Sequence, residues 1–166
     1  MNRIPRSDPR AAHIARHDTV TRSGLDDFVA PRHRWVLATK RDDGRPQLSP
    51  VSGGLVPDGR LVVATYPTRA KAANVRHRPN VSVTVLSDDW NGPWVQVDGT
   101  ASVVEVPEAL DDFVAYYRSI SGEHPDWDEY RRAMAEQGKC LLSIEVTRWG
   151  PIAGGGFPES MFEPEG

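Results

Sequence analysis

Two cations stand at the start of a predicted helix, where the helix dipole does not favour them. The stretch TYPTRAKAANVRHRP (residues 65–79) predicts a short helix with Thr68 as its N-cap, and Pro79 ends it. A helix N-terminus carries partial positive charge, so Arg69 and Lys71 are unfavourably placed there. A phosphate group at this position would meet free backbone N–H groups and two charge-assisted donors. The spacing therefore indicates a phosphate site. The alternative is a solvated basic face that pairs with nearby acidic side chains.

The segment RPQLSPV predicts an incompletely paired strand. Pro46 and Pro50 cannot donate ladder hydrogen bonds, so the strand is at least partly edge-like. Gln47 and Ser49 share one face of it, and Leu48 lies on the other. Such an edge offers backbone donors and acceptors to a flat heteroaromatic ligand. The alternative is an edge strand that proline simply protects from further pairing.

Tryptophan is the third candidate, at Trp90, Trp94, Trp127 and Trp149. Its side chain commonly lines ligand or subunit surfaces, and packing in a core or an interface is the alternative for each of the four. Trp94 and Gln96 share one strand face, which makes this pair the most site-like.

The residue types that perform hydrolytic or metal chemistry do not gather in this sequence. His13 and His17 are spaced i, i+4 but have no partner ligands, so no metal site is expected. Cys140 opens an apolar strand and is expected to be buried rather than nucleophilic. There is no G-x-S-x-G, Walker or Rossmann motif. We identify no catalytic side chain, so a cofactor would have to supply the chemistry of any enzyme.

The size and charge of the chain exclude further classes of protein. The chain has 166 residues and 18.4 kDa, which is one domain with a real core. A net charge of −3 and a pI near 5.9 argue against a general nucleic-acid binder. One cysteine favours a reducing cytoplasm, and no apolar run reaches the roughly 18 residues of a membrane span. We therefore expect a cytoplasmic protein with neither a nucleic-acid nor a membrane partner.

The elements that would position these residues are mainly strands. Asp42-Asp43-Gly44 predicts a hairpin, Pro57-Asp58-Gly59 a second turn, and Gly99 a bulge. Predicted strands cover residues 34–40, 45–54, 60–66, 80–86, 94–106 and 140–150. The pattern favours an antiparallel, closed or half-closed barrel with peripheral helices, and not a parallel sheet.

Three further helices accompany the strands. One begins near Ser23, one has Pro107 in its first turn, and one runs from a cap at Asp126 to Gly138. The predicted organisation is a disordered or loosely docked tail over residues 1–19, a barrel domain over 20–150, and a Gly/Pro-rich C-terminal tail over 151–166.

Five motifs occur in an order that resembles a known superfamily. They are LATK, DGRPQLSPV, TRAKAANVRHRPNVSV, WVQVDGTA and GEHPDWDEYRRAM. It is the flavin-reductase-like split-barrel superfamily named for pyridoxamine 5′-phosphate oxidase, and the resemblance covers roughly residues 25–150. The chain looks most similar to the actinobacterial branch that binds the deazaflavin coenzyme F-420.

The resemblance implies a six-stranded antiparallel split β-barrel, the FMN-binding split barrel, in a homodimer with two cofactor sites at the interface. It implies that Arg69 and Lys71 hold the cofactor phosphate, with Asn74 beside it. The cofactor ring would lie along Gln47, Ser49, Pro50, Val51, Val63, Ala64 and Thr65. The partner subunit would supply Trp94, Gln96 and Trp149.

The function implied is an F-420-dependent reductase that passes a hydride from the reduced deazaflavin to a small-molecule acceptor. An FMN-dependent oxidase or reductase is the alternative within the fold, because both cofactors present a phosphate and a tricyclic ring. The ending VTRWGPIAGGG does not match the arginine-containing motif of oxidases that act on pyridoxamine phosphate, so pyridoxal phosphate synthesis is not expected. A non-catalytic carrier of flavin, deazaflavin or haem is a further alternative. A basic helix that contacts protein or nucleic acid is another, against which the acidic pI argues.

Overall fold

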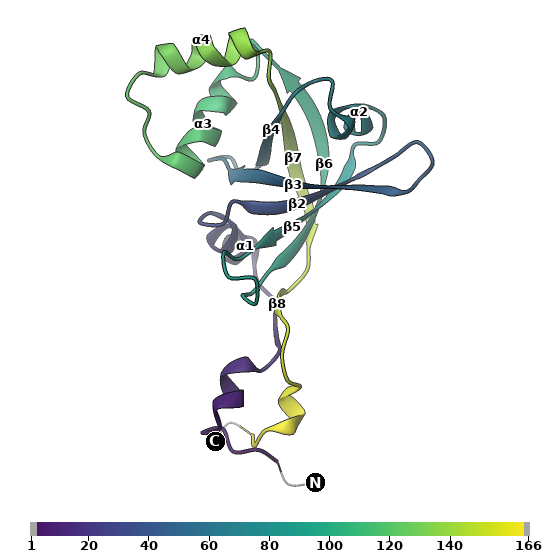
Figure 1. The fold of residues 1–166 in the computed structure, drawn as a ribbon, viewed down its shortest axis with the longest axis vertical. Coiled ribbons are helices and arrows are strands. Elements are labelled where there is room, and N and C mark those ends of the chain that lie inside the picture. Colours follow the sequence, from purple (N-terminus) through teal and green to yellow (C-terminus); the bar gives the residue numbers. More distant parts are fainter. Residues whose placement is uncertain (1–2, 165–166) are drawn as a thin grey trace.

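Six antiparallel strands close into a barrel at the centre of the molecule, for which the computed structural model describes residues 3–164 (Figure 1). Around the barrel the strand order is β2-β3-β4-β7-β6-β5. The strands are β2 (Arg34–Lys40), β3 (Pro46–Leu55), β4 (Leu61–Thr65), β5 (Asn80–Leu86), β6 (Val95–Glu105) and β7 (Cys140–Trp149). The predicted mainly-β architecture with a six-stranded antiparallel barrel is confirmed.

Alternation along the strands builds the barrel core. In β5, for example, Val81, Val83 and Val85 point inward and are buried. Glycine closes the two predicted turns, where Gly44 has a φ of 84° and Gly59 a φ of 85°. Both turns are therefore where the sequence predicted them.

The barrel is open between β3 and β4 over part of its height. β3 pairs with β2 from Pro46 to Ser52, but with β4 only at Gly53, Gly54 and Leu55. Residues 46–52 consequently have a neighbouring strand on one side only. This confirms the edge-like character predicted for RPQLSPV, and we call this opening the β3–β4 split.

The β6–β7 ladder has a bulge beside Gly99, and the extra residue, Thr147, belongs to β7. The register shifts between Asp98 and Gly99, where β6 pairs with β7. A Cβ atom at Gly99 would lie 2.5 Å from the carbonyl oxygen of Glu145, so a side chain does not fit there. The irregularity predicted at Gly99 is confirmed, although the extra residue is on the partner strand β7.

Four helices surround the barrel: α1 (Arg22–Val29), α2 (Ala70–His77), α3 (Leu110–Ser121) and α4 (Trp127–Gln137). Within residues 3–164, no helix is long and apolar enough to cross a membrane. α3 and α4 pack together at one end of the barrel (Figure 1).

Three predicted helix ends can be compared with the structure. Asp126 accepts a hydrogen bond from the Glu129 N–H at 2.9 Å, as predicted, and Gly138 is the left-handed C-cap. The prediction of Thr68 as the N-cap of α2 was wrong by one residue, because Arg69 has the extended backbone of a cap. Pro107 does not lie in the first turn of α3, since its carbonyl accepts from Leu110, where the helix begins.

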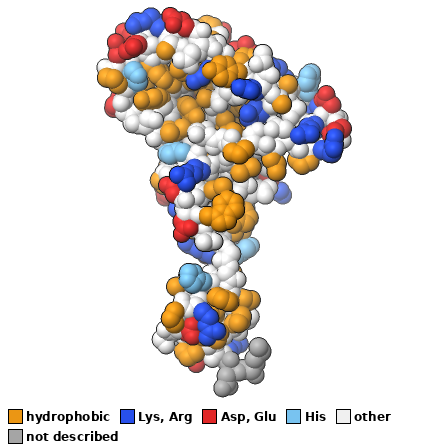
Figure 2. All heavy atoms as spheres, viewed as in Figure 1, with side chains coloured by type: hydrophobic (Ala, Val, Ile, Leu, Met, Phe, Trp, Pro, Cys, Tyr) orange, Lys and Arg blue, Asp and Glu red, His pale blue; other side chains and the backbone are white. Residues whose placement is uncertain are grey.

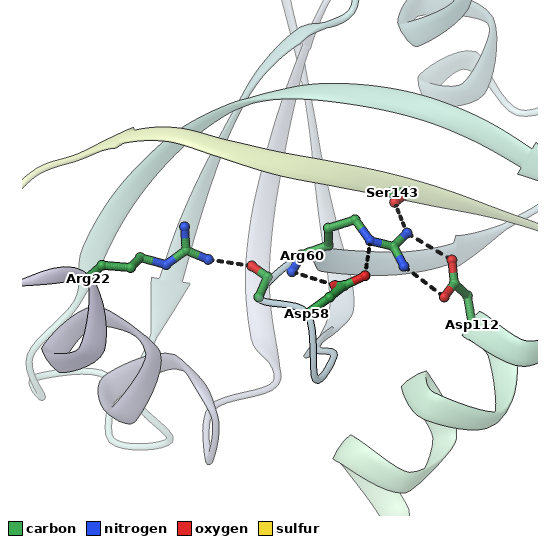
Figure 3. Close-up of polar contacts among 6 residues, drawn as sticks. Arg22, Asp58, Arg60, Asp112 and Ser143 are labelled. Carbon is green, nitrogen blue, oxygen red and sulfur yellow. Dashed lines mark hydrogen bonds and ion pairs between the residues drawn. The ribbon is translucent and has the colours of Figure 1, made fainter.

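An arginine network joins α3 to the turn between β3 and β4 (Figure 3). The Arg60 guanidinium donates to Asp58 at 2.7 Å, to both carboxylate oxygens of Asp112 in α3 and to Ser143 in β7. Arg22 of α1 donates to the carbonyl of Gly59 in the same turn. Through these bonds the helices hold the β3–β4 turn from two sides.

The two chain ends lie side by side and project from the barrel through a narrow waist (Figures 1 and 2). Strands β1 (Arg16–Asp18) and β8 (Ile152–Gly154) pair, and the 3-10 helices η1 (Pro9–His13) and η2 (Glu159–Met161) follow outward. We call residues 3–18 and 151–164 the terminal arm. The sequence predicted two separate, loosely ordered tails and gave no sign of this pairing. The outermost parts of those tails, residues 1–2 and 165–166, lie outside the described residues.

Candidate functional site

The cations of the α2 segment fall into two classes according to their partners. Arg76 pairs with Glu105 at 2.6 Å and Arg78 with Asp42 at 2.5 Å. Arg69 and Lys71 make no ion pair or side-chain hydrogen bond with any residue from 3 to 164. Pairing with acidic side chains, the alternative considered for this face, therefore applies to the end of the helix and not to its start.

The first turn of α2 offers donors and no acceptors. Its N-cap residue makes no side-chain cap hydrogen bond, and the first turn holds no acidic residue. The backbone N–H groups of Ala70 and Lys71 come too early in the helix for an intrahelical acceptor. Free amides, the positive end of the dipole and two cations together can bind an anion.

A third cation lies near the same turn. Thr65 of β4 pairs with Cys140 of β7, which brings Lys139 alongside. The Lys139 ammonium lies 5.9 Å from the centre of the Tyr66 ring, where a cation and an aromatic face attract. Sequence reasoning did not select Lys139, because only the pairing of β4 with β7 puts it there.

A chain of hydrogen bonds connects α2 to the interior of β2 and β3. The Asn74 amide donates to the Thr39 hydroxyl at 3.0 Å, which donates to the Gln47 carbonyl oxygen at 3.1 Å. The Gln47 amide then donates to the Ser49 hydroxyl at 2.6 Å. Three of the predicted site residues are therefore joined in one network through Thr39, which is 2% exposed. Sequence reasoning missed Thr39, although a polar residue on the inward face of β2 was a usable signal.

Tyr116 of α3 lies in the β3–β4 split. Its hydroxyl donates to the carbonyl oxygen of Ser52 at 3.0 Å. In the register that ends at Gly53 and Val63, Ser52 would pair next with Ala64. Burial raises the pKa of the Tyr116 phenol, an effect that a hydrogen bond with the Ala64 backbone partly offsets. The hydroxyl thus contacts both strands where the next rung of the ladder would lie.

The predicted ring-binding residues lie on both sides of this split, with different accessibility. Pro50 is exposed, and Val51 and Ala64 are half-buried. Ser49 and Thr65 are buried at 7% and 8% exposure. Val63 is fully buried, and its backbone pairs with strands on both sides. In the single chain Val63 is a core residue, and the other positions border the opening.

The remaining predicted residues lie elsewhere. Trp94, Gln96 and Trp149 line a groove of about 600 Å³ where the terminal arm meets the barrel. Backbone bonds of 2.8 Å tie Trp94 to Ala153, which precedes the end of β8. In Figure 1, α2 lies beside the upper part of the barrel and β8 at its lower end. One chain therefore does not bring these three residues to Arg69 and Lys71.

Charges in this groove are paired with each other. Arg148 bonds Asp98 at 2.8 Å, and Asp98 also accepts from Ser82 at 2.7 Å and Gln96 at 3.1 Å. Burial raises the pKa of Asp98, but the three hydrogen-bond donors outweigh burial and hold that pKa below its usual value. The carboxylate is therefore ionised at neutral pH and its charge is balanced by Arg148.

Of the other candidates, Cys140 and Trp127 are structural in this chain and Trp90 is not packed in the core. Cys140 is fully buried, as expected, and burial raises the pKa of its thiol. Trp127 packs edge-on against Tyr117 and Tyr130 between α3 and α4. Trp90 is 87% exposed on the loop between β5 and β6.

Comparison with the sequence models of known families gives a match to this chain. The sequence model of the family described as pyridoxamine 5′-phosphate oxidase matches residues 23–153, well over half of the chain.

Solved structures give the same fold. A conserved hypothetical protein from Mycobacterium tuberculosis is 27% identical, with a TM-score of 0.67 over 80% of this chain and 84% of that one. An F-420 reductase is 18% identical, with a TM-score of 0.57 over 75% of this chain and 94% of that one. The heme storage protein HutZ from Vibrio cholerae is 20% identical, with a TM-score of 0.61 over 80% and 95%. The last two likenesses concern the fold alone.

Proposed function

The chain belongs to the pyridoxamine 5′-phosphate oxidase family, and we propose that it is an F-420-dependent reductase that works as a homodimer. Members of such a fold include proteins with different cofactors, as the reductase and the heme storage protein illustrate. The choice of cofactor therefore depends on the chemistry of the donors in this chain.

The observation that carries the proposal is the unpaired first turn of α2. Arg69 and Lys71 have no acidic partner within residues 3–164, whereas Arg76 and Arg78 do. A cofactor phosphate fits this donor set, because it would accept from both cations and from the first backbone N–H groups. Asn74 is then held near the phosphate by its bond to Thr39.

The tricyclic ring would occupy the β3–β4 split. There the backbone of β3 faces no strand on one side, and Gln47, Ser49, Pro50, Val51, Ala64 and Thr65 border the opening. When bound, a reduced deazaflavin supplies a hydride from C5 of its ring. The residues of the chain contribute orientation and exclusion of water, and orientation alone can supply roughly 7–11 kcal/mol.

A second copy of the chain completes the proposed site. Trp94 and Trp149 line the groove beside the terminal arm, away from α2, so a partner subunit would bring them to the ring. Gln96 lines both this groove and a cavity that it shares with Thr39 and Pro46. This separation supports the proposal of a homodimer with two sites at the interface. We place the protein in the cytoplasm, in keeping with its single, buried cysteine.

Titration with F-420 and with FMN tests the proposal, with the fluorescence of the five tryptophans as the readout. We expect saturable binding of F-420, and Arg69→Ala or Lys71→Ala should weaken it by about tenfold to a hundredfold. That range corresponds to about 1.5–3 kcal/mol for a hydrogen bond to a charged group. Arg76→Ala is the matched control, since this cation already has a partner, and it should leave the affinity almost unchanged.

Three results would contradict the proposal. Tighter binding of FMN than of F-420 would favour the flavin-dependent alternative. Binding of haem alone, seen as a Soret band, would favour a carrier, although none of the thirteen candidate residues is a His, Cys, Met or Tyr that could ligate iron. Equal effects of Arg69→Ala and Arg76→Ala on F-420 affinity would contradict the proposed phosphate site.

A further inference from the structure

The hydrogen-bond chain between α2 and β3 has a direction that one carbonyl group fixes. The side-chain amide nitrogen of Gln47 donates to the backbone carbonyl of Leu48 at 3.1 Å, and a carbonyl oxygen can only accept. The same nitrogen lies 2.6 Å from the Ser49 hydroxyl, so this hydroxyl is the acceptor in that bond. The amide oxygen of Gln47 then faces Thr39 and accepts from the Thr39 hydroxyl at 3.1 Å.

Thr39 carries the same direction back to α2. A hydroxyl has one proton, and the proton of Thr39 is used in the bond to Gln47. The Thr39 oxygen therefore accepts from the amide of Asn74 at 3.0 Å. Every bond in the chain donates from α2 toward β3, and the chain ends at the hydroxyl of Ser49.

Ser49 keeps a proton that no residue of the described chain accepts. Its hydroxyl donates to no group within residues 3–164, although the residue is buried. A buried donor without an acceptor costs free energy, so a ligand that accepts from it gains affinity. Ser143 of β7 is also buried and also accepts, from Arg60 at 2.6 Å. It differs in its surroundings, because β7 pairs there with β4 on one side and β6 on the other.

Alternation of the backbone groups along β3 places Ser49 beside the β3–β4 split. The Gly53 N–H donates to the carbonyl of His33, on the side of β2, at 3.0 Å. Successive residues of a strand turn their N–H and C=O groups to opposite sides, and the β2–β3 register is continuous, so the Leu48 carbonyl turns to the side of the split. The Gln47 amide bonds both this carbonyl and Ser49, so the Ser49 hydroxyl lies at the opening.

This edge of β3 is poor in donors. Pro46 and Pro50 fall on the same side of the strand as Leu48, and neither carries an N–H group. The Ser49 hydroxyl therefore supplies a donor where two backbone donors are missing. A ligand at this edge is selected by whether it presents an acceptor to that hydroxyl.

We propose that Ser49 donates a hydrogen bond to a carbonyl oxygen or an unprotonated ring nitrogen of a flat ligand in the split, and that Thr39 is the positioning residue for this donor. Without the Thr39 hydroxyl, the Gln47 amide is free to turn, and its oxygen then accepts the Ser49 proton. That the ligand is the ring of F-420 rests on the proposed function. The direction of the chain and the remaining proton do not.

Titration of the full-length chain with F-420 and with FMN tests the donor. Ser49→Ala should weaken the binding of the preferred cofactor by about twofold to tenfold, as expected for a hydrogen bond between uncharged groups. Ser49→Cys keeps a weak donor and should have an intermediate affinity. Ser143→Ala is the matched control, because it removes a buried hydroxyl that lies away from the split, and it should leave the affinity unchanged.

Thr39→Val tests the positioning role, because it keeps the shape of the side chain and removes the hydroxyl. It should weaken binding, and Thr39→Ser should restore it. In the Thr39→Val background, Ser49→Ala should weaken binding no further, because the donor is already lost. The absorption spectrum of the bound ring is a second readout: Thr39→Val and Ser49→Ala should change it in the same way, and Ser143→Ala should not.

The outcomes separate this inference from the proposed function. Equal effects of Ser49→Ala and Ser143→Ala would overturn the donor, and a full effect of Ser49→Ala in the Thr39→Val background would overturn the positioning role. If F-420 binding depends on Arg69 but not on Ser49, the inference falls and the proposed function stands. If FMN binds in place of F-420 and depends on Ser49, the proposed function falls and the inference stands.

Discussion

Arg69 and Arg76 lie on the same short segment, yet their surroundings differ. Glu105, at the end of β6, approaches Arg76 and neutralises it. No such residue of the described chain approaches Arg69, at the other end of the helix. A cation near a helix N-terminus that lacks a partner raises the energy of the free protein, and an anionic ligand lowers it again. If the proposed anion binds here, ligand binding and helix stability are coupled at this residue.

Tyr116 is the second residue whose neighbours define a role. Tyr116→Phe keeps the ring but removes the hydroxyl that bonds Ser52, so we expect a loss of about 0.5–1.5 kcal/mol in the free energy of unfolding. Urea denaturation measures this loss. Because the hydroxyl bonds β3 beside the split proposed for the cofactor ring, cofactor affinity should fall as well.

Tyr117→Phe is the control for this change. The Tyr117 hydroxyl makes no hydrogen bond within residues 3–164, while its ring packs against Tyr130 as Tyr116 does not. The control should alter neither stability nor cofactor affinity. Equal effects of the two substitutions would show that the Tyr116 hydroxyl does not act at the split.

At the scale of elements, two turns of the same sequence pattern differ in what they hold. Asp43-Gly44-Arg45 and Asp58-Gly59-Arg60 each form the same Asp–Arg bonds within the turn. Only Arg60 reaches further, to Asp112 on α3 and Ser143 on β7 (Figure 3). Its side chain is 27% exposed, whereas that of Arg45 is 74% exposed. The hydrogen bonds that Arg60 donates to the Asp112 carboxylate raise the pKa of Arg60 further above its usual value.

This pair of turns gives a matched test. Arg60→Met should lower the free energy of unfolding by about 1.5–3 kcal/mol, because it breaks charged hydrogen bonds that join α3 to the barrel. Arg45→Met removes only the exposed bond within its turn and should change stability by less than about 0.5 kcal/mol. Chemical denaturation of both variants measures the difference. Similar losses in the two would show that the bonds to Asp112 and Ser143 add nothing.

At the scale of the whole molecule, the candidate residues occupy two ends of one barrel. α2 and the groove lined by Trp94 and Trp149 lie apart in one chain, and this separation is the physical reason for proposing a homodimer. A barrel does not bend to bring its ends together, because hydrogen bonds to neighbouring strands fix each strand in place. A site that needs both ends needs two chains.

Mixed dimers test this arrangement. One chain carries Arg69→Ala with Lys71→Ala, and the other carries Trp94→Ala with Gln96→Ala. Each variant alone should bind F-420 weakly, and a mixed dimer purified through two different tags should regain one tight site. Fluorescence titration counts these sites. A mixed dimer that regains no tight site would indicate that the whole site lies within one chain. A monomer in sedimentation analysis would contradict the proposed homodimer.

The barrel follows from local patterns. Alternating β-branched residues, as in Asn80–Leu86, set inward and outward faces, and glycine after aspartate sets the turns. The predicted starts of α2 and α3 differ from the observed ones by one to three residues. Several capping conformations are compatible with the same local sequence, and only packing selects between them. The phosphate-binding candidates could likewise be found from their positions at a helix start.

Tertiary structure decided everything that depends on residues far apart in the chain. By itself, the sequence determined a β-barrel with an inserted basic helix, since strand alternation, turns and helix ends are local. It did not reveal that Arg76 is paired and Arg69 is not, because Glu105 comes from a distant strand. Nor did it reveal the terminal arm, whose two strands come from opposite chain ends. The physical reason is that hydrogen bonds and ion pairs depend on distance in space, which only the closed barrel fixes.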